Sequence, residues 1–401
     1  MKTQTTEVNP LEAGQLDPGF GDFGQIRPNL QSGSVRAAVL SDEGALTYAT
    51  RQGEGFTLYR TDSDGIKDKA FANDGNTGEW QFVGGKKASP SRLLLQDDRK
   101  ILVIGDTREP DGIGRAALRR FHANGSPDLV FGSVVIPVAH HDYAQVESID
   151  GCLQDDGKVL VTFSFYISAS EGALLVRLHS NGELDTDFGD SGFVEVESGG
   201  DFILLCSVVI QDGKIVIGGT TESGQLVLAR YDLEGQVDTQ FGVDGFAFFA
   251  TTDGSLRMSQ LIAQADGKLV CAGGIGGIQD ARGMVMRFTA DGHPDEEWNG
   301  GLPVLTDTGP ETFWSSLAQQ LDGKIVVVGY NRARHIIAGR LLPDGDHDTR
   351  FGRAGSGWVS FSPSGGLPWD VKVQGAARII VGGEAFIENG SRGPVVYGLQ
   401  A

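Results

Sequence analysis

Short hydrophobic runs alternate with glycine-containing turns along most of the chain. In residues 207–219, one run of β-branched residues ends at Asp212-Gly213-Lys214 and a second run follows. Two such runs joined by an Asp-Gly turn predict a β-hairpin, because this dipeptide tolerates the positive φ that a tight turn requires. Six further turns, some of them degenerate, repeat the pattern, beginning at Glu43, Asp98, Asp156, Asp266, Asp322 and Ala376.

A second signature follows six of the seven hairpins and has a fixed spacing. It consists of an Arg, a Gly at +5, an Asp at +8 and an aromatic residue at +11, which we call the frame. Its six copies are Arg60/Gly65/Asp68/Phe71, Arg120/Gly125/Asp128/Phe131, Arg177/Gly182/Asp185/Phe188, Arg230/Gly235/Asp238/Phe241, Arg287/Gly292/Asp295/Trp298 and Arg340/Gly345/Asp348/Phe351.

The two signatures together predict one four-stranded antiparallel sheet for each repeat of about 55 residues. A third strand would end at the frame Arg, and a fourth would lie around the Phe-Gly pair. Such a sheet leaves a hydrophobic face open, which radial stacking buries, while closure of the ring protects the edges. We therefore predict an all-β fold, a seven-bladed β-propeller over residues 16–401, preceded by an N-terminal tail over residues 1–15.

The two ends of the chain are complementary. The last unit has Val396 in the place of the frame Arg and stops at Ala401, so its Asp and its Phe-Gly strand are missing. Residues 16–21 match residues 184–189 of a complete unit but follow no hairpin. We expect the N-terminal strand to complete the last blade and close the ring.

These motifs resemble those of the bacterial delta-60 repeat proteins over roughly residues 16–401. The shared pattern is an apolar-Gln-x-Asp-Gly-Lys-apolar segment followed by Arg-Tyr/Phe-x-x-x-Gly-x-x-Asp-x-x-Phe-Gly. Trp298-Asn299 and Phe71-Ala72 depart from it at the Phe-Gly pair. The resemblance implies a propeller, often in exported or surface proteins, and implies no single activity.

The repeated Arg and Asp residues have two interpretations. One is a ligand site in every blade. The other, which we favour, is a repeated structural ion pair or set of turn hydrogen bonds, because each partner recurs in every unit across a turn.

Composition excludes some partners. Asp and Glu outnumber Lys and Arg by 53 to 33, and the net charge of −20 would repel phosphate backbones. We expect no nucleic-acid partner, no membrane insertion and a monomeric state. No apolar stretch is long enough for a membrane span or a signal peptide, so we expect a cytoplasmic protein or one exported by a leaderless route.

We also expect no cofactor. The acidic turns at Asp62-Ser63-Asp64 and at Asp185-Thr186-Asp187 offer oxygen ligands, which leaves calcium as an alternative. Neither turn has the full calcium-binding loop with its terminal Glu.

Function is expected on one face of the disc. With the strands of a blade named A to D from the axis outward, the A–B and C–D turns are uniform and share one face. The B–C loops and D–A crossovers vary between units and share the other, and variable loops on a rigid scaffold are common binding sites. The candidate binding residues there are His140, His141, Asp142, Tyr143, Glu311, Trp314, Tyr330, Trp369 and Asp370. For Trp314 and Trp369 the alternative role is structural, at the channel mouth or between blades.

Aromatic residues beside carboxylates suit a sugar or a peptide side chain. No phosphate-binding loop, nucleophile elbow or His-Glu-x-x-His motif is present. We therefore expect a non-catalytic interaction propeller for a protein or glycan partner, with no catalytic residue assigned. The alternative is a hydrolase or lyase with an acid/base cluster at the central channel mouth, for which His140, His141 and Asp142 are candidates.

Overall fold

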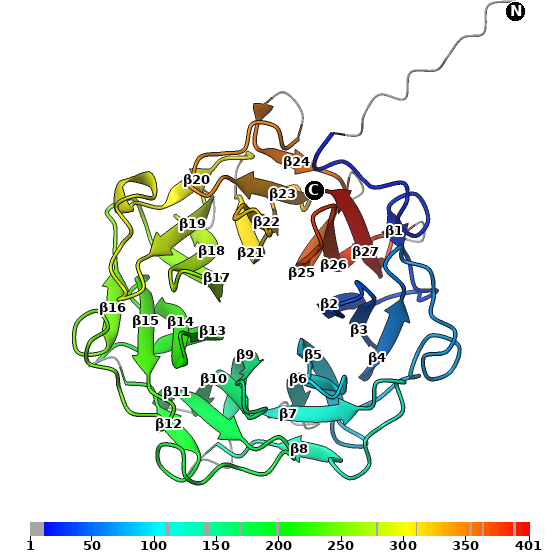
Figure 1. The fold of residues 1–401 in the computed structure, drawn as a ribbon, viewed down its shortest axis with the longest axis horizontal. Coiled ribbons are helices and arrows are strands. Elements are labelled where there is room, and N and C mark those ends of the chain that lie inside the picture. Colours follow the sequence, from blue (N-terminus) through cyan, green and yellow to red (C-terminus); the bar gives the residue numbers. More distant parts are fainter. Residues whose placement is uncertain are drawn as a thin grey trace, which may run out of the picture.

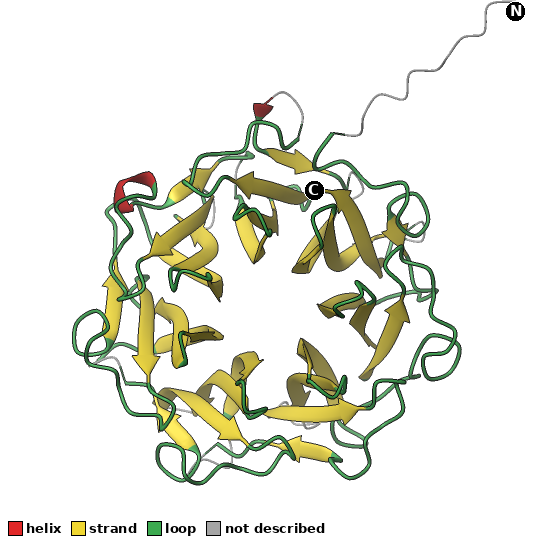
Figure 2. Ribbon diagram, in the orientation of Figure 1, coloured by secondary structure: helices red, strands yellow, loops and turns green. Residues whose placement is uncertain are grey.

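The computed structural model describes residues 12–108, 113–138, 144–167, 170–197, 200–277, 280–309, 311–352, 355–362, 365–387 and 390–401. Seven antiparallel sheets surround a central axis (Figure 1), six with four strands and one with three. Helical structure within the described ranges is limited to short turns at the rim such as η1 (Asn299–Gly301) (Figure 2). The predicted all-β, seven-bladed propeller is confirmed.

The strands of a blade follow one another from the axis to the rim. Blade 1 contains β2 (Ser34–Leu40), β3 (Leu46–Gln52) and β4 (Gly55–Thr61). Blade 2 contains β5 (Lys87–Leu95), β6 (Ile101–Arg108), β7 (Gly114–Phe121) and β8 (Ser133–Val135). Blade 3 contains β9 (Gln145–Leu153), β10 (Val159–Ile167), β11 (Ser170–Leu178) and β12 (Phe193–Glu195). Blade 4 contains β13 (Ile203–Gln211), β14 (Lys214–Thr221), β15 (Leu226–Tyr231) and β16 (Phe246–Phe249).

The remaining blades complete the ring. Blade 5 contains β17 (Leu256–Ala263), β18 (Leu269–Ile275), β19 (Arg282–Phe288) and β20 (Val304–Thr306). Blade 6 contains β21 (Phe313–Gln319), β22 (Ile325–Tyr330), β23 (Ile336–Leu341) and β24 (Trp358–Ser360). Blade 7 contains β25 (Gly366–Gln374), β26 (Arg378–Phe386), β27 (Arg392–Gln400) and, from the other end of the chain, β1 (Gln25–Ile26).

The hairpin turn of blade 4 forms as its Asp-Gly pair predicts. Gln211 pairs with Lys214 across Asp212 and Gly213, whose φ angles are 49° and 75°. Two successive positive φ values define the turn type that matches the twist of paired strands. The apolar side chains flanking such turns pack between neighbouring blades, as Val216 of blade 4 does with Leu261 of blade 5.

The N-terminal strand closes the ring, as predicted. Gln25 of β1 pairs with Tyr397 of β27, and the backbone N–H of Asp17 donates to the Gly398 carbonyl at 2.8 Å. Figure 1 shows the two ends of the chain in the same blade. Hydrogen bonds to the propeller begin before residue 16, because Gly14 N–H donates to the Gln400 carbonyl at 2.8 Å.

The frame residues connect each blade to the next. In six blades the frame Arg donates from Nε to the frame Asp at 2.6–2.9 Å and lies over the frame aromatic ring at 4.4–4.7 Å. The same guanidinium reaches the following blade, as Arg120 does by donating to the Ser180 carbonyl at 2.5 Å. The interpretation of a repeated structural ion pair is confirmed.

The frame Gly receives the aromatic ring of the preceding blade. Gly182 has a φ of 90°, and a Cβ atom there would lie 2.8 Å from the Phe131 ring. Only glycine combines this backbone conformation with so close a contact. The conserved spacing of the repeat therefore reflects contacts between blades as well as turns within them.

Blade 7 assembles the same trio of guanidinium, carboxylate and aromatic ring from both ends of the chain. Arg378 donates to Asp17 at 2.6 Å and lies over the Phe20 ring at 5.1 Å. Our assignment of Val396 to the frame Arg place is wrong by two residues. The residue there is Gly398, at which a Cβ atom would lie 2.6 Å from the Phe20 ring, so Arg378 from the hairpin turn supplies the guanidinium instead.

The fourth strand does not lie around the Phe-Gly pair, and that expectation is also wrong. Phe188 and Gly189 lie in a loop, and the outer strand β12 begins at Phe193. The Phe188 ring is buried because Arg177 covers it and the next blade packs on it. Because Phe188 is held between Arg177 and the next blade, it does not belong to the alternating pattern of a strand.

The connections separate into the two faces that the repeat predicts. The A–B and C–D turns, with the frame residues, form the uniform face. The B–C turns and the D–A crossovers form the variable face. The described part of the chain contains no helix with the length and apolarity needed to cross a bilayer.

Candidate functional site

A β-bulge in each innermost strand aims side chains into the central channel. All seven pairings between the first and second strand of a blade have a register shift near the variable face. A bulge bends the strand and turns the extra residue away from the ladder. The channel is therefore lined by residues that the repeat places there in every blade.

The bulge residues are not equivalent around the ring. Four blades carry a small one, and blade 3 places two residues opposite Phe163. The neighbouring blades 7 and 1 carry the large ones, an indole and a guanidinium. In order of blades 1 to 7 the residues are Arg36, Ser91, Ser148 with Ile149, Cys206, Ser259, Ser315 and Trp369. The repeat symmetry of the channel is broken by the extra residue in blade 3 and, with the largest side chains, at blades 7 and 1.

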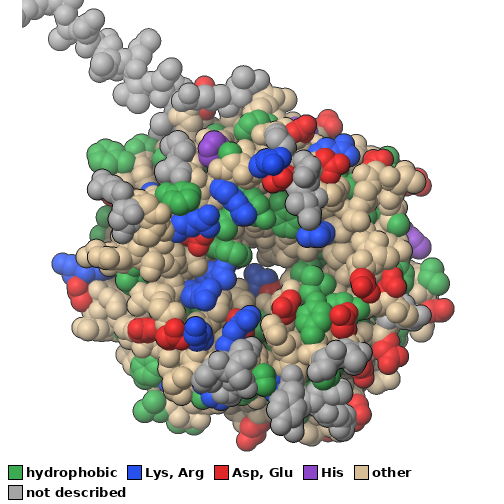
Figure 3. Space-filling model, turned by 180° about the vertical axis from the view of Figure 1, so that it is seen from behind, with side chains coloured by type: hydrophobic (Ala, Val, Ile, Leu, Met, Phe, Trp, Pro, Cys, Tyr) green, Lys and Arg blue, Asp and Glu red, His purple; other side chains and the backbone are tan. Residues whose placement is uncertain are grey.

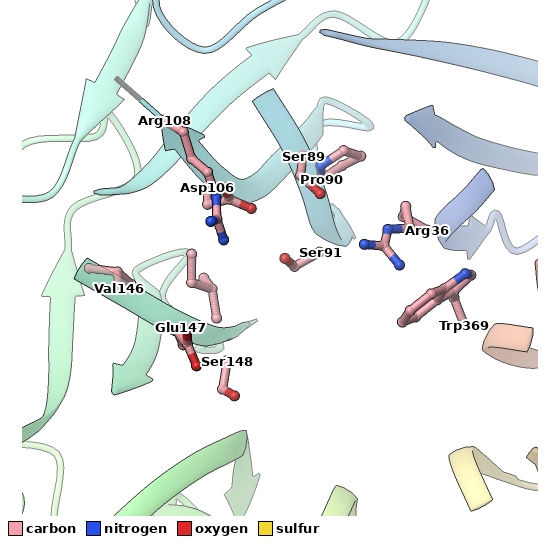
Figure 4. A pocket seen from close by; sticks show the side chains of 11 residues that line it. Arg36, Ser89, Pro90, Ser91, Asp106, Arg108, Val146, Glu147, Ser148 and Trp369 are labelled. Carbon is pink, nitrogen blue, oxygen red and sulfur yellow. Dashed lines mark hydrogen bonds and ion pairs between the residues drawn. The ribbon is translucent and has the colours of Figure 1, made fainter. Parts of the chain in front are cut away.

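A pocket of about 420 Å³ opens where Arg36 and Trp369 lie, on the variable face beside the channel. Blades 1, 2, 3 and 7 contribute its lining residues, most of which are polar: Arg36, Ser89, Pro90, Ser91, Asp106, Arg108, Val146, Glu147, Ser148, Ile149 and Trp369. Figure 4 shows Arg36 beside Trp369, with Asp106 and Arg108 on one wall and Glu147 and Ser148 on another.

Arg36 is the exceptional charge in this pocket. Its guanidinium carbon lies 3.7 Å from the centre of the Trp369 ring. Within the described ranges, its side chain makes no hydrogen bond or ion pair. Burial, followed by repulsion from Arg51, lowers the pKa of Arg36 to about 10, against the attraction of Glu384 and Asp106.

The carboxylates near Arg36 already have partners. Glu384 pairs with Arg392 at 2.9 Å and Asp106 with Arg108 at 2.8 Å. Arg51, like Arg36, has no hydrogen-bonding or ion-pairing partner for its side chain among the described residues. Figure 3 shows several Lys and Arg side chains along one side of the central opening of this face.

Next to the bulges in the innermost strands, polar side chains form hydrogen bonds and ion pairs between neighbouring blades. We call this set, which includes Arg92, Asp150, Gln260 and Asp370, the belt. Asp370 belongs to it, because its Oδ2 accepts the Ala38 backbone N–H of blade 1 at 2.8 Å. Gln260 accepts the Leu317 N–H of blade 6 at 2.9 Å in the same way. Asp370 is largely buried in the wall of the ring, where it borders the central channel beside Trp369.

The belt also contains an arginine with the opposite environment to Arg36. Arg92 lies 2.6 Å from Asp150 through Nε and 2.5 Å through Nη2. Burial alone would lower the pKa of Arg92, but the attraction of Asp150 and Asp370 outweighs it and raises the pKa. Arg92 is therefore a satisfied structural residue.

The other predicted residues within the described ranges do not line this pocket. Trp314 is fully buried between blades 5 and 6, against Gly283 and Gly339. Glu311 pairs with Arg332 at 3.6 Å on blade 6. Tyr330, also on blade 6, packs on Phe313 with ring centres 6.0 Å apart. His140, His141, Asp142 and Tyr143 lie outside the described residues.

Of the predicted candidates that lie within the described residues, Trp369 is the one that lines this pocket, and 39% of the residue is exposed. Arg36 was missed. A signal for it was present in the sequence, since the residue seven positions before the hairpin turn residue is Ser91, Ser259 or Ser315 in three units and Arg36 or Trp369 in two. The residues from second strands, such as Asp106, carry no comparable signal.

In the two acidic turns considered for calcium, Asp62 binds the backbone and Asp185 pairs with Arg177 and Lys158. Asp62 Oδ1 accepts the N–H groups of Asp64 and Ile66 at 3.0 and 2.8 Å. Among the described residues, no three His, Cys, Asp or Glu side chains are grouped so that they could hold a metal ion.

One protein family matches part of the sequence. The family model described as "Domain of unknown function (DUF5122) beta-propeller" matches residues 96–131, 154–188 and 210–241, about a quarter of the chain. Each match runs from the hairpin turn of blade 2, 3 or 4 to the frame aromatic of that blade. No curated protein sequence matches the chain.

Solved structures with the same architecture include several lyases. An ulvan lyase bound to a glucuronate and sulfated rhamnose repeat has a TM-score of 0.57 at 11% identity, covering 94% of this chain and 96% of that one. A catalytically inactive virginiamycin B lyase from Staphylococcus aureus with quinupristin has a TM-score of 0.52 at 11% identity, covering 92% and 97%. At this identity the similarity shows the fold alone.

Proposed function

We propose that this protein is a non-catalytic binding propeller of the delta-60 repeat type, which receives a carbohydrate at the channel mouth of its variable face. The observation that carries the proposal is the break in repeat symmetry at blades 7 and 1. Five blades present no large polar or aromatic bulge residue, whereas Trp369 and Arg36 lie side by side in a pocket. A repeat that served the fold alone would have no need of this difference.

The lining of the pocket favours a sugar over a peptide strand. Ser89, Ser91 and Ser148 offer hydroxyl groups, Glu147 offers an acceptor, and the partly exposed indole of Trp369 offers an apolar surface. Sites for small polar ligands combine such groups. A peptide added as a strand needs a regular free edge, which the bulge in every innermost strand interrupts.

A lyase or hydrolase is the competing function. The described lining of the pocket contains no histidine, cysteine or tyrosine, the side chains most often used as a base or nucleophile beside a carboxylate. Solved lyases share the fold. Turnover of a bound oligosaccharide, followed by product analysis, would support the enzyme and contradict a purely binding role.

The proposal is tested with an array of neutral and acidic oligosaccharides and of peptides. We expect oligosaccharides to bind and Trp369→Ala to lose the binding. Trp358→Ala, which removes a partly buried tryptophan of the outer strand β24, is the matched control and should bind as the wild type does. Binding that Trp369→Ala leaves unchanged would contradict the channel mouth as the site.

A further inference from the structure

We propose that Arg36 binds the carboxylate of an acidic sugar, so that the ligand of the channel mouth is a uronate-containing glycan. The inference rests on the proposed function, and it adds the substrate class and the residue that selects it. The ligand would supply a carboxylate to pair with the Arg36 guanidinium.

The frame arginines, which have the Asp partner that Arg36 lacks in the described part of the chain, provide the comparison. Arg177 lies over the Phe188 ring at 4.4 Å and pairs with Asp185 at 2.7 Å. Arg36 lies over the Trp369 ring at 3.7 Å but has no carboxylate among the described residues. Guanidinium groups on an aromatic face keep their edge free for a planar, bidentate anion. The pair formed by Arg36 and Trp369 therefore resembles a frame whose Asp is absent.

A second stacked arginine shows that the missing partner is not a general feature. Arg119 lies over the Trp80 ring at 4.4 Å at the rim of the disc. Its Nη1 donates to the Gln81 carbonyl at 3.0 Å and to Ser133 Oγ at 2.8 Å. Arg119 is thus engaged by the fold, whereas Arg36 faces the pocket.

The local charge balance also favours an anion. Arg392 and Arg108 neutralise Glu384 and Asp106, so these carboxylates do not fully compensate Arg36 and Arg51. Burial, followed by repulsion from Arg51, lowers the pKa of Arg36, and the attraction of Glu384 and Asp106 does not offset it. In a chain with a net charge of −20, an uncompensated pair of arginines beside the channel is a local exception.

The rest of the lining fits the sugar that would carry the carboxylate. Ser91 and Ser148 lie on the blades that follow Arg36 around the channel, and Glu147 lies on the far wall (Figure 4). Hydroxyl groups of a sugar ring donate to carboxylates such as Glu147 and exchange hydrogen bonds with serines. An acidic side chain of a protein would use Arg36 but would leave these groups without partners.

Calorimetric titration with matched ligands tests the inference. The probes are tetrasaccharides of glucuronate and of galacturonate, their methyl esters, which keep the rings and remove the charge, and a tetraglutamate peptide. We expect at least one of the two acids to bind at least tenfold more tightly than its ester, because the carboxylate forms a charge-assisted hydrogen bond. Arg36→Gln should abolish this preference, and Arg36→Lys should retain part of it. Arg99→Gln, which removes an exposed arginine from the hairpin turn of blade 2, should change nothing.

Three results would overturn the inference. Equal affinity for acid and ester, unaffected by Arg36→Gln, would leave carbohydrate binding in place and remove the role of the carboxylate. Binding of tetraglutamate through Arg36 without binding of either uronate would assign the site to an acidic protein. Binding of no uronate would exclude the acidic sugar, while the oligosaccharide array with Trp369→Ala would still decide the proposed function. Thermal unfolding of each variant shows that the fold is retained.

Discussion

Arg177 on the uniform face and Arg36 at the channel mouth have similar surroundings up to a point. Both have the guanidinium carbon over an aromatic ring, 4.4 Å from its centre for Arg177 and 3.7 Å for Arg36. Arg177 also has Asp185 and a carbonyl of the next blade as partners, so it contributes to the ring in the same way as its five counterparts. Arg36 has no such partner among the described residues, and its environment disfavours its charge. The repeat therefore explains the first arginine as part of the fold, and the second requires a reason outside the fold.

The largest effect is expected from removing the seventh trio. Deletion of residues 1–26 takes away β1, Asp17 and Phe20, which complete blade 7. We predict that the protein loses cooperative unfolding, because the deletion opens the ring and removes Asp17, the nearer of the two carboxylates that pair with Arg378. Deletion of residues 1–11, which spares these contacts, is the control. Differential scanning calorimetry distinguishes the two, and a cooperative transition of wild-type midpoint in the longer deletion would contradict ring closure.

A single frame should be costly to break. Asp185→Ala leaves the buried Arg177 guanidinium without its partner, and we predict a loss of about 3 to 5 kcal/mol in the free energy of unfolding. Asp187→Ala, on the same turn but exposed, should change it by less than about 0.5 kcal/mol. Denaturant titration measures both. Similar losses in the two variants would mean that the turn, and not the ion pair, stabilises the blade.

Replacing Arg92 should cost much more stability than replacing Arg36. Arg92→Gln leaves Asp150 buried and unpaired, so we predict a loss of about 3 kcal/mol. Arg36→Gln removes a charge without a counter-ion, and we predict a change below about 1 kcal/mol, the size of a stacking contribution. Chemical denaturation of the two variants tests this. A large loss in Arg36→Gln would mean that Arg36 serves the fold.

The smallest effect concerns pH. Burial would raise the pKa values of Asp185 and Asp238, but hydrogen bonds and the attraction of nearby Lys and Arg residues outweigh it and lower them. A lowered pKa in the folded state stabilises the fold above the unfolded value of about 4, and this contribution disappears as pH falls through the folded value. We predict that stability declines below about pH 4, and less steeply in Asp185→Asn. An identical slope in wild type and variant would contradict the role of this carboxylate.

The sequence predicted the fold well because each unit repeats the same contacts. The spacing of Arg177, Gly182, Asp185 and Phe188 reflects stacking, pairing and packing on the next blade, so six copies indicate one structure. The exchange of strands between the two ends followed from the incomplete last unit. The outer strand was misplaced because Phe188 is buried by Arg177 from a loop, which an apolar residue in a pattern of strands does not reveal.

The site was predicted less well for a related reason. Arg36 lies in an innermost strand, where a bulge turns it into the channel, and a bulge leaves no mark in a single apolar run. Asp370 looked like a loop residue, but it hydrogen-bonds to Ala38 in the wall of the ring. Trp314 packs between blades against Gly283, which is the structural role that the sequence left open for it. Variation between the units at the bulge position, as between Ser91 and Arg36, is the more informative signal.

The most direct test is a crystal structure of the protein soaked with a uronate tetrasaccharide that binds in solution. We predict a carboxylate within about 3 Å of the Arg36 guanidinium, in the position that Asp185 takes relative to Arg177, with the Arg36 side chain still on Trp369. A sugar bound elsewhere, or an Arg36 side chain that leaves Trp369 to pair with Asp106 or Glu384, would contradict the assignment.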